Sequence, residues 1–465
     1  MTESLKRAHA YADDWLEKLA TENVNATANE TKLRAAFDGP LPQLGTAAPD
    51  VVDFIAENAR DGLIGSPSGR FFAWVIGGGV QSALAADWLV SAWDQNAALF
   101  ACSPAAAIIE EVAGSWIKEL LDLPGQASFA FTTGCQMAHM TSLAAARHAV
   151  LKRHGWSVEE DGLFGAPRIK VFTSNNKHGS VERAVRYLGL GRGCLHFVAT
   201  DDLGRMIPEA LEREMSDYDG PAIVSLNAAD LNVGACDPFA QIIPIAKSKG
   251  AWVHCDGAFG LFSRASKKRK HLVDGIELAD SWVTDGHKWL NVPFDCGIAI
   301  INDPDAHRSA MTLAADYVAP SERARDQIDW NPEWSRRARG IPIYAALKEL
   351  GRDGVEAMID RCCDHCLALV EGIGALDGAE VIHLPTLNQG LVRFTSQGNS
   401  ETENDAFTLG VMEAINASGE AFFSDTLWKG QRAMRVSVVN WQTNKDDVER
   451  AIAAAGAAIA AQQKP

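Results

Sequence analysis

The chain has 465 residues, 47% of them hydrophobic and 22% charged, which is the balance of a globular protein long enough for two or three domains. Its 43 lysines and arginines stand against 60 aspartates and glutamates, a formal net charge of −17. This acidity argues against nucleic acid or an anionic membrane surface as a partner. The basic run at 267–270 is interpreted as a solvated loop.

The cysteines and apolar runs bear on where the protein works. Nine cysteines, an odd number, fall mostly inside apolar runs, as reduced buried thiols do in a cytosolic enzyme. Residues 1–20 alternate charged with apolar side chains, so we expect no signal peptide. No apolar run approaches ~18 residues without a charge, so we expect no membrane span and a cytoplasmic protein.

The first 60 residues predict helices that lack a core of their own. Apolar side chains between Leu5 and Leu19 recur on one helical face, and a second helical segment starts near Val51 after a break at 38–49. No strand lies near these helices. We therefore expect them to pack on something else, such as a second subunit.

From Ser103 onward, short apolar strands alternate with longer helical segments. The expected strands are 128–132, 168–173, 194–199, 222–226, 251–255, 281–284 and 297–301, and the expected helices are 105–121, 136–153, 181–188, 208–214 and 239–249. This alternation predicts an α/β fold with a mostly parallel, seven-stranded sheet covered by helices. In such sheets the ligand lies beyond the carboxyl ends of the strands.

The remainder of the chain predicts a loop and a smaller domain. Residues 304–339 are polar and aperiodic, which predicts a long loop of the kind that is often functional. Helices at 343–350, 354–373 and 445–462 and strands at 391–394, 421–425 and 433–438 follow. We predict three parts, an N-terminal helical segment 1–85, a large domain 86–345 and a small C-terminal α+β domain 346–465.

Two glycine-containing segments are candidate phosphate sites. Thr133, Gly134 and Cys135 join the first strand to a helix, and the exposed backbone N–H groups of a helix N-terminus suit a phosphate. Taken alone, this segment is better interpreted as a plain strand-to-helix turn. Gly77-Gly78-Gly79 follows no strand, so we interpret it as a flexible pocket loop and not a dinucleotide fingerprint.

Two further strand ends carry ionisable side chains. His178 precedes the helix near Val181 and is placed either to cap that helix or to lie over a planar ligand. Asp256 emerges from a buried strand, where a carboxylate is costly unless a cation faces it. A protonated pyridine nitrogen would serve as that cation.

Lys288 follows the strand 281–284 and the turn Asp285-Gly286, among large apolar side chains such as Trp289. Desolvation there disfavours the ammonium form and makes the amine a better nucleophile. A lysine that snorkels from a core strand is the plainer interpretation of this residue alone. A phosphate site, a stacking ring, a buried carboxylate and a nucleophilic lysine together match pyridoxal phosphate, which the lysine carries as a Schiff base and the aspartate keeps protonated as an electron sink.

The segment 285–296, Asp-Gly-His-Lys-Trp-Leu-Asn-Val-Pro-Phe-Asp-Cys, resembles the cofactor-lysine motif of the group II pyridoxal-phosphate decarboxylases, which include the aromatic-L-amino-acid, glutamate and 2,4-diaminobutyrate enzymes. Segments 70–74, 103–105, 177–184 and 256–258 agree, so that the resemblance covers roughly residues 60–440. It implies the aspartate-aminotransferase-like fold, known as fold type I. It also implies a homodimer interlocked by the N-terminal helices, with the active site at the subunit interface.

The resemblance also implies residue roles. Lys288 would hold pyridoxal 5'-phosphate, Asp256 would bind the pyridine nitrogen, and His178 would stack on the ring opposite Ala258. The phosphate would be surrounded by Thr133, Gly134, Cys135 and His287, and Asn232 would lie on a loop near the cofactor.

The implied reaction is decarboxylation of an L-amino acid to the amine and carbon dioxide. In the aromatic enzymes a mobile loop supplies a tyrosine that returns the proton, but the matching region 325–330 has none, and Tyr317 is the candidate. Without that donor the carbanionic intermediate would react with oxygen, so oxidative decarboxylation-deamination to an aldehyde stays open. Another lyase or aminotransferase reaction would share every cofactor residue, whereas a catalytically dead binding protein would be expected to lose Lys288 or Asp256.

The substrate pocket and a cysteine cluster complete the predictions. Trp74 lies in a segment that lines the pocket in the family and favours a flat or apolar side chain, whereas Asn96 and Ala98 favour a smaller and more polar one. We expect an aromatic substrate first and an acidic or small polar one second. In the segment 362–366, Cys362 and Cys366 share a helical face while Cys363 points elsewhere, so we expect no metal site.

Overall fold

The computed structural model describes residues 2–312 and 324–463, and the chain divides into two compact units. The small unit comprises Met1–Ile76, His365–Leu384 and Gly390–Pro465, and the large unit comprises Gly77–Asp364 and Pro385–Gln389. The predicted three-part division at residues 85 and 345 stays a prediction. No helix of the described residues is long and apolar enough to cross a membrane.

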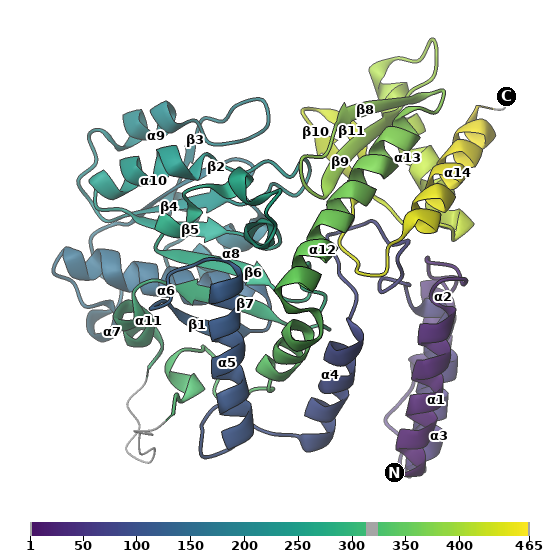
Figure 1. Ribbon diagram of the computed structural model, residues 1–465, viewed down its shortest axis with the longest axis horizontal. Helices are drawn as coiled ribbons and strands as arrows, with labels where there is room; N and C mark the ends of the chain where they lie inside the picture. The colour runs from purple at the N-terminus through teal and green to yellow at the C-terminus, as the bar shows by residue number, and fades with distance from the viewer. Residues whose placement is uncertain (1, 313–323, 464–465) are drawn as a thin grey trace. The chain divides into compact units, whose positions relative to one another are not determined.

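The large unit is built on a seven-stranded sheet (Figure 1). Its strands are β1 (Ser128–Thr132), β2 (Lys170–Ser174), β3 (Leu195–Val198), β4 (Ala222–Asn227), β5 (Trp252–Asp256), β6 (Ser281–Asp285) and β7 (Gly297–Ile301). They lie in the order β1-β7-β6-β5-β4-β2-β3, and all neighbours are parallel except that β7 is antiparallel to both β1 and β6. The predicted mostly parallel, seven-stranded sheet is confirmed, with every strand within two residues of its expected bounds.

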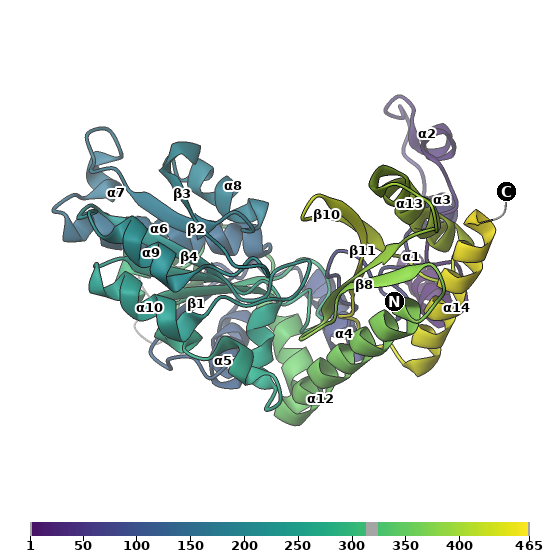
Figure 2. The same cartoon turned by 90° about the horizontal axis from the view of Figure 1, so that it is seen from above.

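Helices join these strands and cover the sheet. They are α4 (Gln81–Trp93), α5 (Pro104–Leu120), α6 (Cys135–Arg153), α7 (Val158–Asp161), α8 (Gly179–Tyr187), α9 (Pro208–Met215), α10 (Phe239–Ser248) and α11 (Pro304–Met311), with short 3₁₀ turns at Arg192–Cys194, Gly260–Ala265, Lys270–Val273, Ile276–Leu278 and Gln327–Asp329. The connections β1-α6-β2 and β4-α10-β5 run across the sheet in opposite directions. Right-handed crossovers therefore place α6 and α10 on opposite faces (Figure 2).

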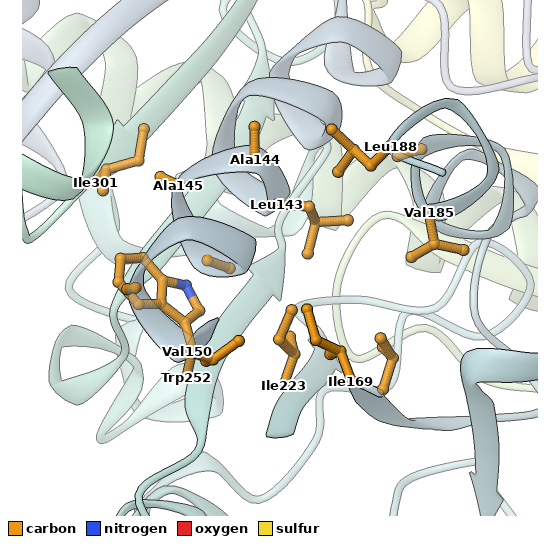
Figure 3. Close-up of a cluster of buried hydrophobic side chains, with 14 of the residues drawn as sticks. Leu143, Ala144, Ala145, Val150, Ile169, Val185, Leu188, Ile223, Trp252 and Ile301 are labelled. Atoms are coloured by element: carbon orange, nitrogen blue, oxygen red, sulfur yellow. The ribbon is translucent and has the colours of Figure 1, made fainter. Parts of the chain in front are cut away.

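Helix α6 forms the centre of the large core. Five of its twelve buried residues are alanine, and these small side chains let the helix lie close to strands β4 to β7. Figure 3 shows Leu143 and Val150 of α6 on the side of the helix where Ile223 of β4 and Trp252 of β5 lie. The N-terminus of α6 is thereby fixed at the carboxyl end of β1.

The long loop predicted at 304–339 is partly wrong, because it begins with helix α11. Asp303 caps this helix by accepting a hydrogen bond from the backbone of Ala306 at 2.9 Å, and Pro304 occupies its first turn. Only one face of α11 is apolar enough to pack inward, with Ala306 and His307 buried, which is why the polar sequence concealed it. Helix α12 (Gly340–Gly374) is interrupted at Gly351, whose φ of 60° falls at the predicted break.

The small unit contains a four-stranded sheet in the order β10-β11-β9-β8. The strands are β8 (Ala379–His383), β9 (Gln389–Phe394), β10 (Ser424–Trp428) and β11 (Gln431–Ser437), and the helices are α1 (Glu3–Lys18), α2 (Glu30–Phe37), α3 (Ala48–Ala59), α13 (Glu401–Ser418) and α14 (Lys445–Gln462), with a 3₁₀ turn at Arg60–Gly62. The strand predicted at 421–425 starts later, because Phe422 instead forms a bridge with Phe71. The terminal helix 445–462 is confirmed.

Candidate active site

Three strands of the large sheet bring the predicted site residues to one edge. Strands β5 and β6 are parallel, and β1 points the same way because β7 is antiparallel to both β1 and β6. Their carboxyl ends carry Gly134-Cys135, Asp256 and Lys288, respectively. The sheet topology thus assembles residues that are far apart in the sequence.

The segment after β1 presents the N-terminus of α6. Gly134 has φ 146°, which disfavours residues with a side chain, and a Cβ built there would lie 3.4 Å from Cε1 of His287. The backbone N–H of Cys135, the first residue of α6, donates to Oδ1 of Asp285 at 2.6 Å. The predicted anion-binding turn is therefore a helix N-terminus that lies against the side chains of Asp285 and His287.

Lys288 pairs with the residue three positions before it. Its Nζ lies 2.9 Å from Oδ2 of Asp285, whose side chain is almost fully buried. Burial by itself would lower the pKa of Lys288, but the Asp285 carboxylate outweighs it and raises the pKa above the ordinary lysine value. The expectation that desolvation favours the neutral amine is therefore wrong, because the turn places the Asp285 carboxylate against the lysine.

His287 is held as a neutral side chain. Its Nδ1 accepts a hydrogen bond from the backbone of Cys296 at 3.1 Å, so the ring proton resides on Nε2, which lies 3.6 Å from Oδ1 of Asp285. Burial lowers the pKa of His287. The ring also stacks on Phe294, with 4.4 Å between centroids. His287 therefore offers an N–H donor toward the start of α6.

Asp256 is an ionised carboxylate within the interior. Oδ1 accepts from the backbone of Ala258 at 3.2 Å, and Oδ2 lies 3.3 Å from Nε2 of His139. Burial would raise the pKa of Asp256, but His139, followed by His178 and Lys288, holds it far below its usual range. Asp256 therefore keeps its negative charge where a cationic ring nitrogen is expected.

His178 is both a helix cap and a site residue. It is the N-cap of α8, and its Nδ1 accepts from the backbone of Ser180 at 3.3 Å and contacts the Ser180 hydroxyl at 2.7 Å. Desolvation lowers the pKa of His178, and the Asp256 carboxylate opposes that lowering. The cap orients the imidazole, while its stacking on a cofactor stays a prediction.

The other predicted residues have these positions. Ala258 bridges strand ends, because its carbonyl accepts from the backbone of Asp285 at 2.9 Å. Thr133 is partly buried beside Gly134, and the backbone of Asn232 donates to Oδ1 of Asp230 in the turn after β4. Tyr317 lies outside the described residues.

The predicted pocket residues belong to both units. Oδ1 of Asn96 accepts from the backbones of Ala98 and Arg336, both at 3.2 Å, so this oxygen supports the loop. Trp74 lies in the small unit, where it packs against Phe422 with 5.3 Å between ring centroids. Their contact with a substrate stays a prediction.

The glycine segment 77–79 is anchored and does not form the flexible loop that we expected. The backbone of Gly78 donates to Oδ1 of Asn291 at 2.8 Å, and the backbone of Val80 donates to the Asn291 carbonyl at the same distance. A Cβ at Gly77 would collide with the carbonyl oxygen of Lys288. The absent side chains let this segment lie directly against the lysine loop.

Two residues of the site escaped the sequence reasoning, His139 and Asp285. Asp285 could have been found from its position three residues before the lysine at a strand end. His139 lies four residues after Cys135 and thus on the same side of α6. This spacing alone does not predict a contact with Asp256, because the sequence does not show which strand that side of α6 covers. Within the described residues no cluster is suited to a metal, and the cysteines of 362–366 are buried on α12.

These residues fit pyridoxal phosphate part by part. The start of α6 and His287 supply N–H donors for a phosphate, Lys288 supplies an amine for the aldehyde, and Asp256 supplies the anion for the ring nitrogen. His139, His178 and Lys288 all lower the pKa of Asp256, so this carboxylate has cationic or polar groups around it. Within the described residues, the buried Nε2 of His139 has no aligned hydrogen-bond partner, as expected beside a site where a charged ligand binds.

Comparison with known proteins agrees with this fit. Residues 31–397 match the pyridoxal-dependent decarboxylase conserved domain. The chain is 29% identical to L-2,4-diaminobutyrate decarboxylase of Rhizobium meliloti (strain 1021), over 91% of this chain and 85% of that one, and 26% identical to aromatic-L-amino-acid decarboxylase of Bacillus atrophaeus, over 94% and 90%. A crystal structure of Oryza sativa TDC with PLP and tryptamine superposes with a TM-score of 0.92 at 21% identity, covering 99% of this chain and 98% of that one.

The family match spans most of the chain, and the fold and the site chemistry agree with it. The reaction class is therefore pyridoxal-phosphate-dependent amino-acid decarboxylation. The chain belongs to the pyridoxal-dependent decarboxylase family, and its cofactor is pyridoxal 5'-phosphate.

Proposed function

We propose that the protein converts an aromatic L-amino acid to its amine and carbon dioxide. The observation that carries the proposal is that Lys288 and the ionised Asp256 follow neighbouring parallel strands, β6 and β5, at the same edge of the sheet. An amine that holds the cofactor and a carboxylate that stabilises positive charge are both required to draw electrons from the bond to the carboxyl group.

Each residue of the site has a definite task. Pyridoxal phosphate, when bound, supplies an electron sink beside the α carbon of the amino acid. The backbone of Cys135 and Nε2 of His287, both of which now face Asp285, would hold the phosphate end, and Asp256 would keep a proton on the ring nitrogen. His178, oriented by its cap, would fix the plane of the ring.

An aromatic substrate is favoured by the side chains near the lysine. Phe294 is 60% exposed and stacks on His287, which places an open apolar ring beside the anchoring segment. Asn96, the residue that favoured a polar substrate, uses its oxygen on two backbone groups. A relative that acts on 2,4-diaminobutyrate keeps an acidic or small polar amino acid as the second choice.

A panel of amino acids tests the substrate. The holoenzyme is incubated with L-tryptophan, L-tyrosine, L-2,4-diaminobutyrate and L-glutamate, and carbon dioxide and product mass are recorded for each. The expected result is amine from an aromatic acid at a kcat/KM at least ~10-fold above the others, a difference of about 1.4 kcal/mol in transition-state binding. Turnover of glutamate or diaminobutyrate alone would overturn the aromatic proposal, and an added 2-oxo acid that is required for turnover would indicate an aminotransferase.

A second candidate is oxidative decarboxylation-deamination to the aldehyde. The segment 325–330 has no tyrosine, and two of its side chains contact backbone groups elsewhere in the large unit: Arg325 donates to the carbonyl of Phe129, and Oδ1 of Asp326 accepts from the backbone of Phe100 at 2.8 Å. We propose Tyr317 as the proton donor that protects the amine-forming route. The oxidative reaction would consume dioxygen and water and release carbon dioxide, ammonia and hydrogen peroxide. Peroxide in equal amount to product would replace the first proposal with this one.

We further propose that the enzyme is a cytoplasmic homodimer in which residues 1–85 embrace the second subunit. None of the residues of α1, α2 and α3 is buried, and apolar side chains such as Leu5, Phe54 and Ile55 are about half exposed. An apolar surface of this kind favours association with another copy of the chain. The active site would then receive residues from both subunits.

A further inference from the structure

A line of buried polar groups runs behind Asp256. The indole N–H of Trp252 donates to Oγ of Ser281 at 2.9 Å, and that hydroxyl lies 2.9 Å from Nδ1 of His254. Nε2 of His254 lies 2.9 Å from Nδ1 of His139, and Nε2 of His139 faces Oδ2 of Asp256 at 3.3 Å. All five residues belong to the large unit and none is more than 6% exposed. We call these residues the Asp256 relay.

The relay follows from strand and helix periodicity. Trp252, His254 and Asp256 alternate along β5, so that their side chains point to the same face of the sheet, which is covered by α6. Ser281 is the register partner of His254 on β6. His139 lies one turn after the first residue of α6 and therefore reaches the same place from above.

The two ends of the relay define its direction. Trp252 can only donate, and the ionised Asp256 can only accept. Burial, followed by the influence of His139, lowers the pKa of His254 to about 3, so His254 is neutral and carries one ring proton. With that proton on Nε2, Ser281 donates to Nδ1 of His254, and His254 donates to Nδ1 of His139. A neutral His139 that accepts at Nδ1 carries its own ring proton on Nε2, which faces Asp256.

A second histidine shows what a purely structural arrangement looks like. His307 is also fully buried, and its ring nitrogens contact the Ser128 hydroxyl and the Trp330 carbonyl, each at 2.8 Å. Both partners are neutral, and both contacts are normal hydrogen bonds. His139 differs because one nitrogen faces a carboxylate of the cofactor site without the alignment of a full hydrogen bond.

We propose that His139, backed by His254 and Ser281, is a positioning residue that holds Asp256 as an oriented carboxylate and thereby sets how firmly the cofactor ring nitrogen keeps its proton. This rests on the proposed function, in which Asp256 faces that nitrogen. His139 does not touch the substrate. It acts on the electron sink through the one carboxylate that both groups share.

The test uses holoenzyme loaded with pyridoxal phosphate that carries nitrogen-15 in its ring. The variants are His139→Leu, which removes the N–H, His139→Gln, which returns an amide N–H, and His307→Leu as the matched loss of a buried histidine. We expect the ring-nitrogen signal of His139→Leu to move toward that of a neutral pyridine and the Kd for pyridoxal phosphate to rise about tenfold, the lower bound for losing a supporting partner. His139→Gln should recover most of both changes, and His307→Leu should lose stability without moving the signal.

A ring-nitrogen signal unchanged in folded, loaded His139→Leu would overturn the proposal, as would an equal movement in His307→Leu. Should His139→Leu not fold, Ser281→Ala tests the same relay from its far end, and we expect a smaller movement in the same direction; none would count against the proposal. The nitrogen-15 measurement requires bound cofactor and no turnover. A wild-type enzyme that holds a protonated ring but releases no carbon dioxide would therefore refute the proposed function and leave the relay standing.

Discussion

Asp285 and Lys288 form an ion pair at the end of β6, with 2.9 Å between Oδ2 and Nζ. The same carboxylate accepts the backbone N–H of Cys135 through its other oxygen. Asp285 therefore contacts both the amine of Lys288 and the first backbone N–H of α6. Because only an unprotonated amine attacks an aldehyde, we expect this pair to slow the loading of pyridoxal phosphate onto Lys288.

Asp285→Asn should accelerate that loading. Without the carboxylate, the pKa of Lys288 is no longer raised, and each unit by which it falls multiplies the fraction of reactive amine about tenfold. The measurement is the rate at which the visible absorbance band grows when apoenzyme meets pyridoxal phosphate near neutral pH. Asp295→Asn is the matched control, since Asp295 pairs with Arg339 in the same loop; equal rates in both variants would contradict the prediction.

Lys288→Ala should abolish the visible band and also destabilise the apoenzyme. The change leaves the buried Asp285 carboxylate without its cation, at a cost of roughly 2 kcal/mol, less than for a fully buried pair because Lys288 is partly exposed. Adding Asp285→Asn should recover most of that loss in urea unfolding. A persisting band would show that another residue holds the cofactor.

Acid should destabilise the protein through its buried histidines. Burial lowers the pKa of both His254 and His307 to about 3, so the unfolded chain binds their protons more readily. The free energy of unfolding should fall as the pH drops from about 6.5 toward 3, with a slope of about 1.4 kcal/mol per pH unit for each histidine. His307→Gln should remove one such contribution between pH 4 and 6 and differ from wild type by a constant amount above pH 7; parallel curves throughout would refute the assignment.

Glu110→Ala should be among the most destabilising single changes in the large unit. Arg336 Nη1 lies 2.9 and 2.8 Å from the two carboxylate oxygens of Glu110, and neither side chain is more than 1% exposed. Removing one partner leaves a buried guanidinium unpaired, at about 3 to 5 kcal/mol. The double variant Glu110→Leu/Arg336→Met should recover much of the lost free energy of unfolding, as measured in urea. If the double variant is as unstable as Glu110→Ala, the geometry of the ion pair is itself required.

Ile55→Glu should shift the enzyme toward monomers. Ile55 is 53% exposed on α3, and a carboxylate there would oppose burial against a second subunit. Sedimentation velocity reads the change directly. Leu427→Glu, at a residue 59% exposed on β10, is the matched control. A dimer that persists in Ile55→Glu would mean that the N-terminal helices are not the interface.

The sequence predicts the strands of the sheet well. It does not predict the residues that contact the main site residues, namely His139 beside Asp256 and Asp285 beside Lys288. Strands β1 and β7 have their predicted bounds because five consecutive buried residues leave little doubt about the state of the backbone. The strand predicted at 421–425 begins too early. Phe422 and Phe423 have the apolar character of strand residues, but they stack on Phe71 and Phe72. Helix α11 was concealed by the polar residues of its exposed face.

The site shows the same division. Lys288, Asp256 and His178 could be found because each follows its own strand, and a strand end is visible in one sequence. The sign of the Lys288 pKa could not be predicted, since it depends on how the turn directs Asp285. His139 could not be found from the sequence around it. Its contact with Asp256 depends on how α6 packs over β5 and β6, which one sequence does not reveal.

Strand β7, antiparallel to its neighbours, has a consequence for the lysine loop. It returns the chain from Lys288 straight into the sheet beside β6, with Asp285 opposite Gly297, so no crossover helix intervenes. The loop between Lys288 and Gly297 is short and closed at both ends by strands, so ordering it costs little further entropy. Its backbone cannot shift without breaking the hydrogen bonds of β7 with β1 and with β6. Amide hydrogen exchange in this loop should therefore require nearly global unfolding, and insertions between Lys288 and Gly297 should be tolerated worse than insertions in any surface turn of the sheet.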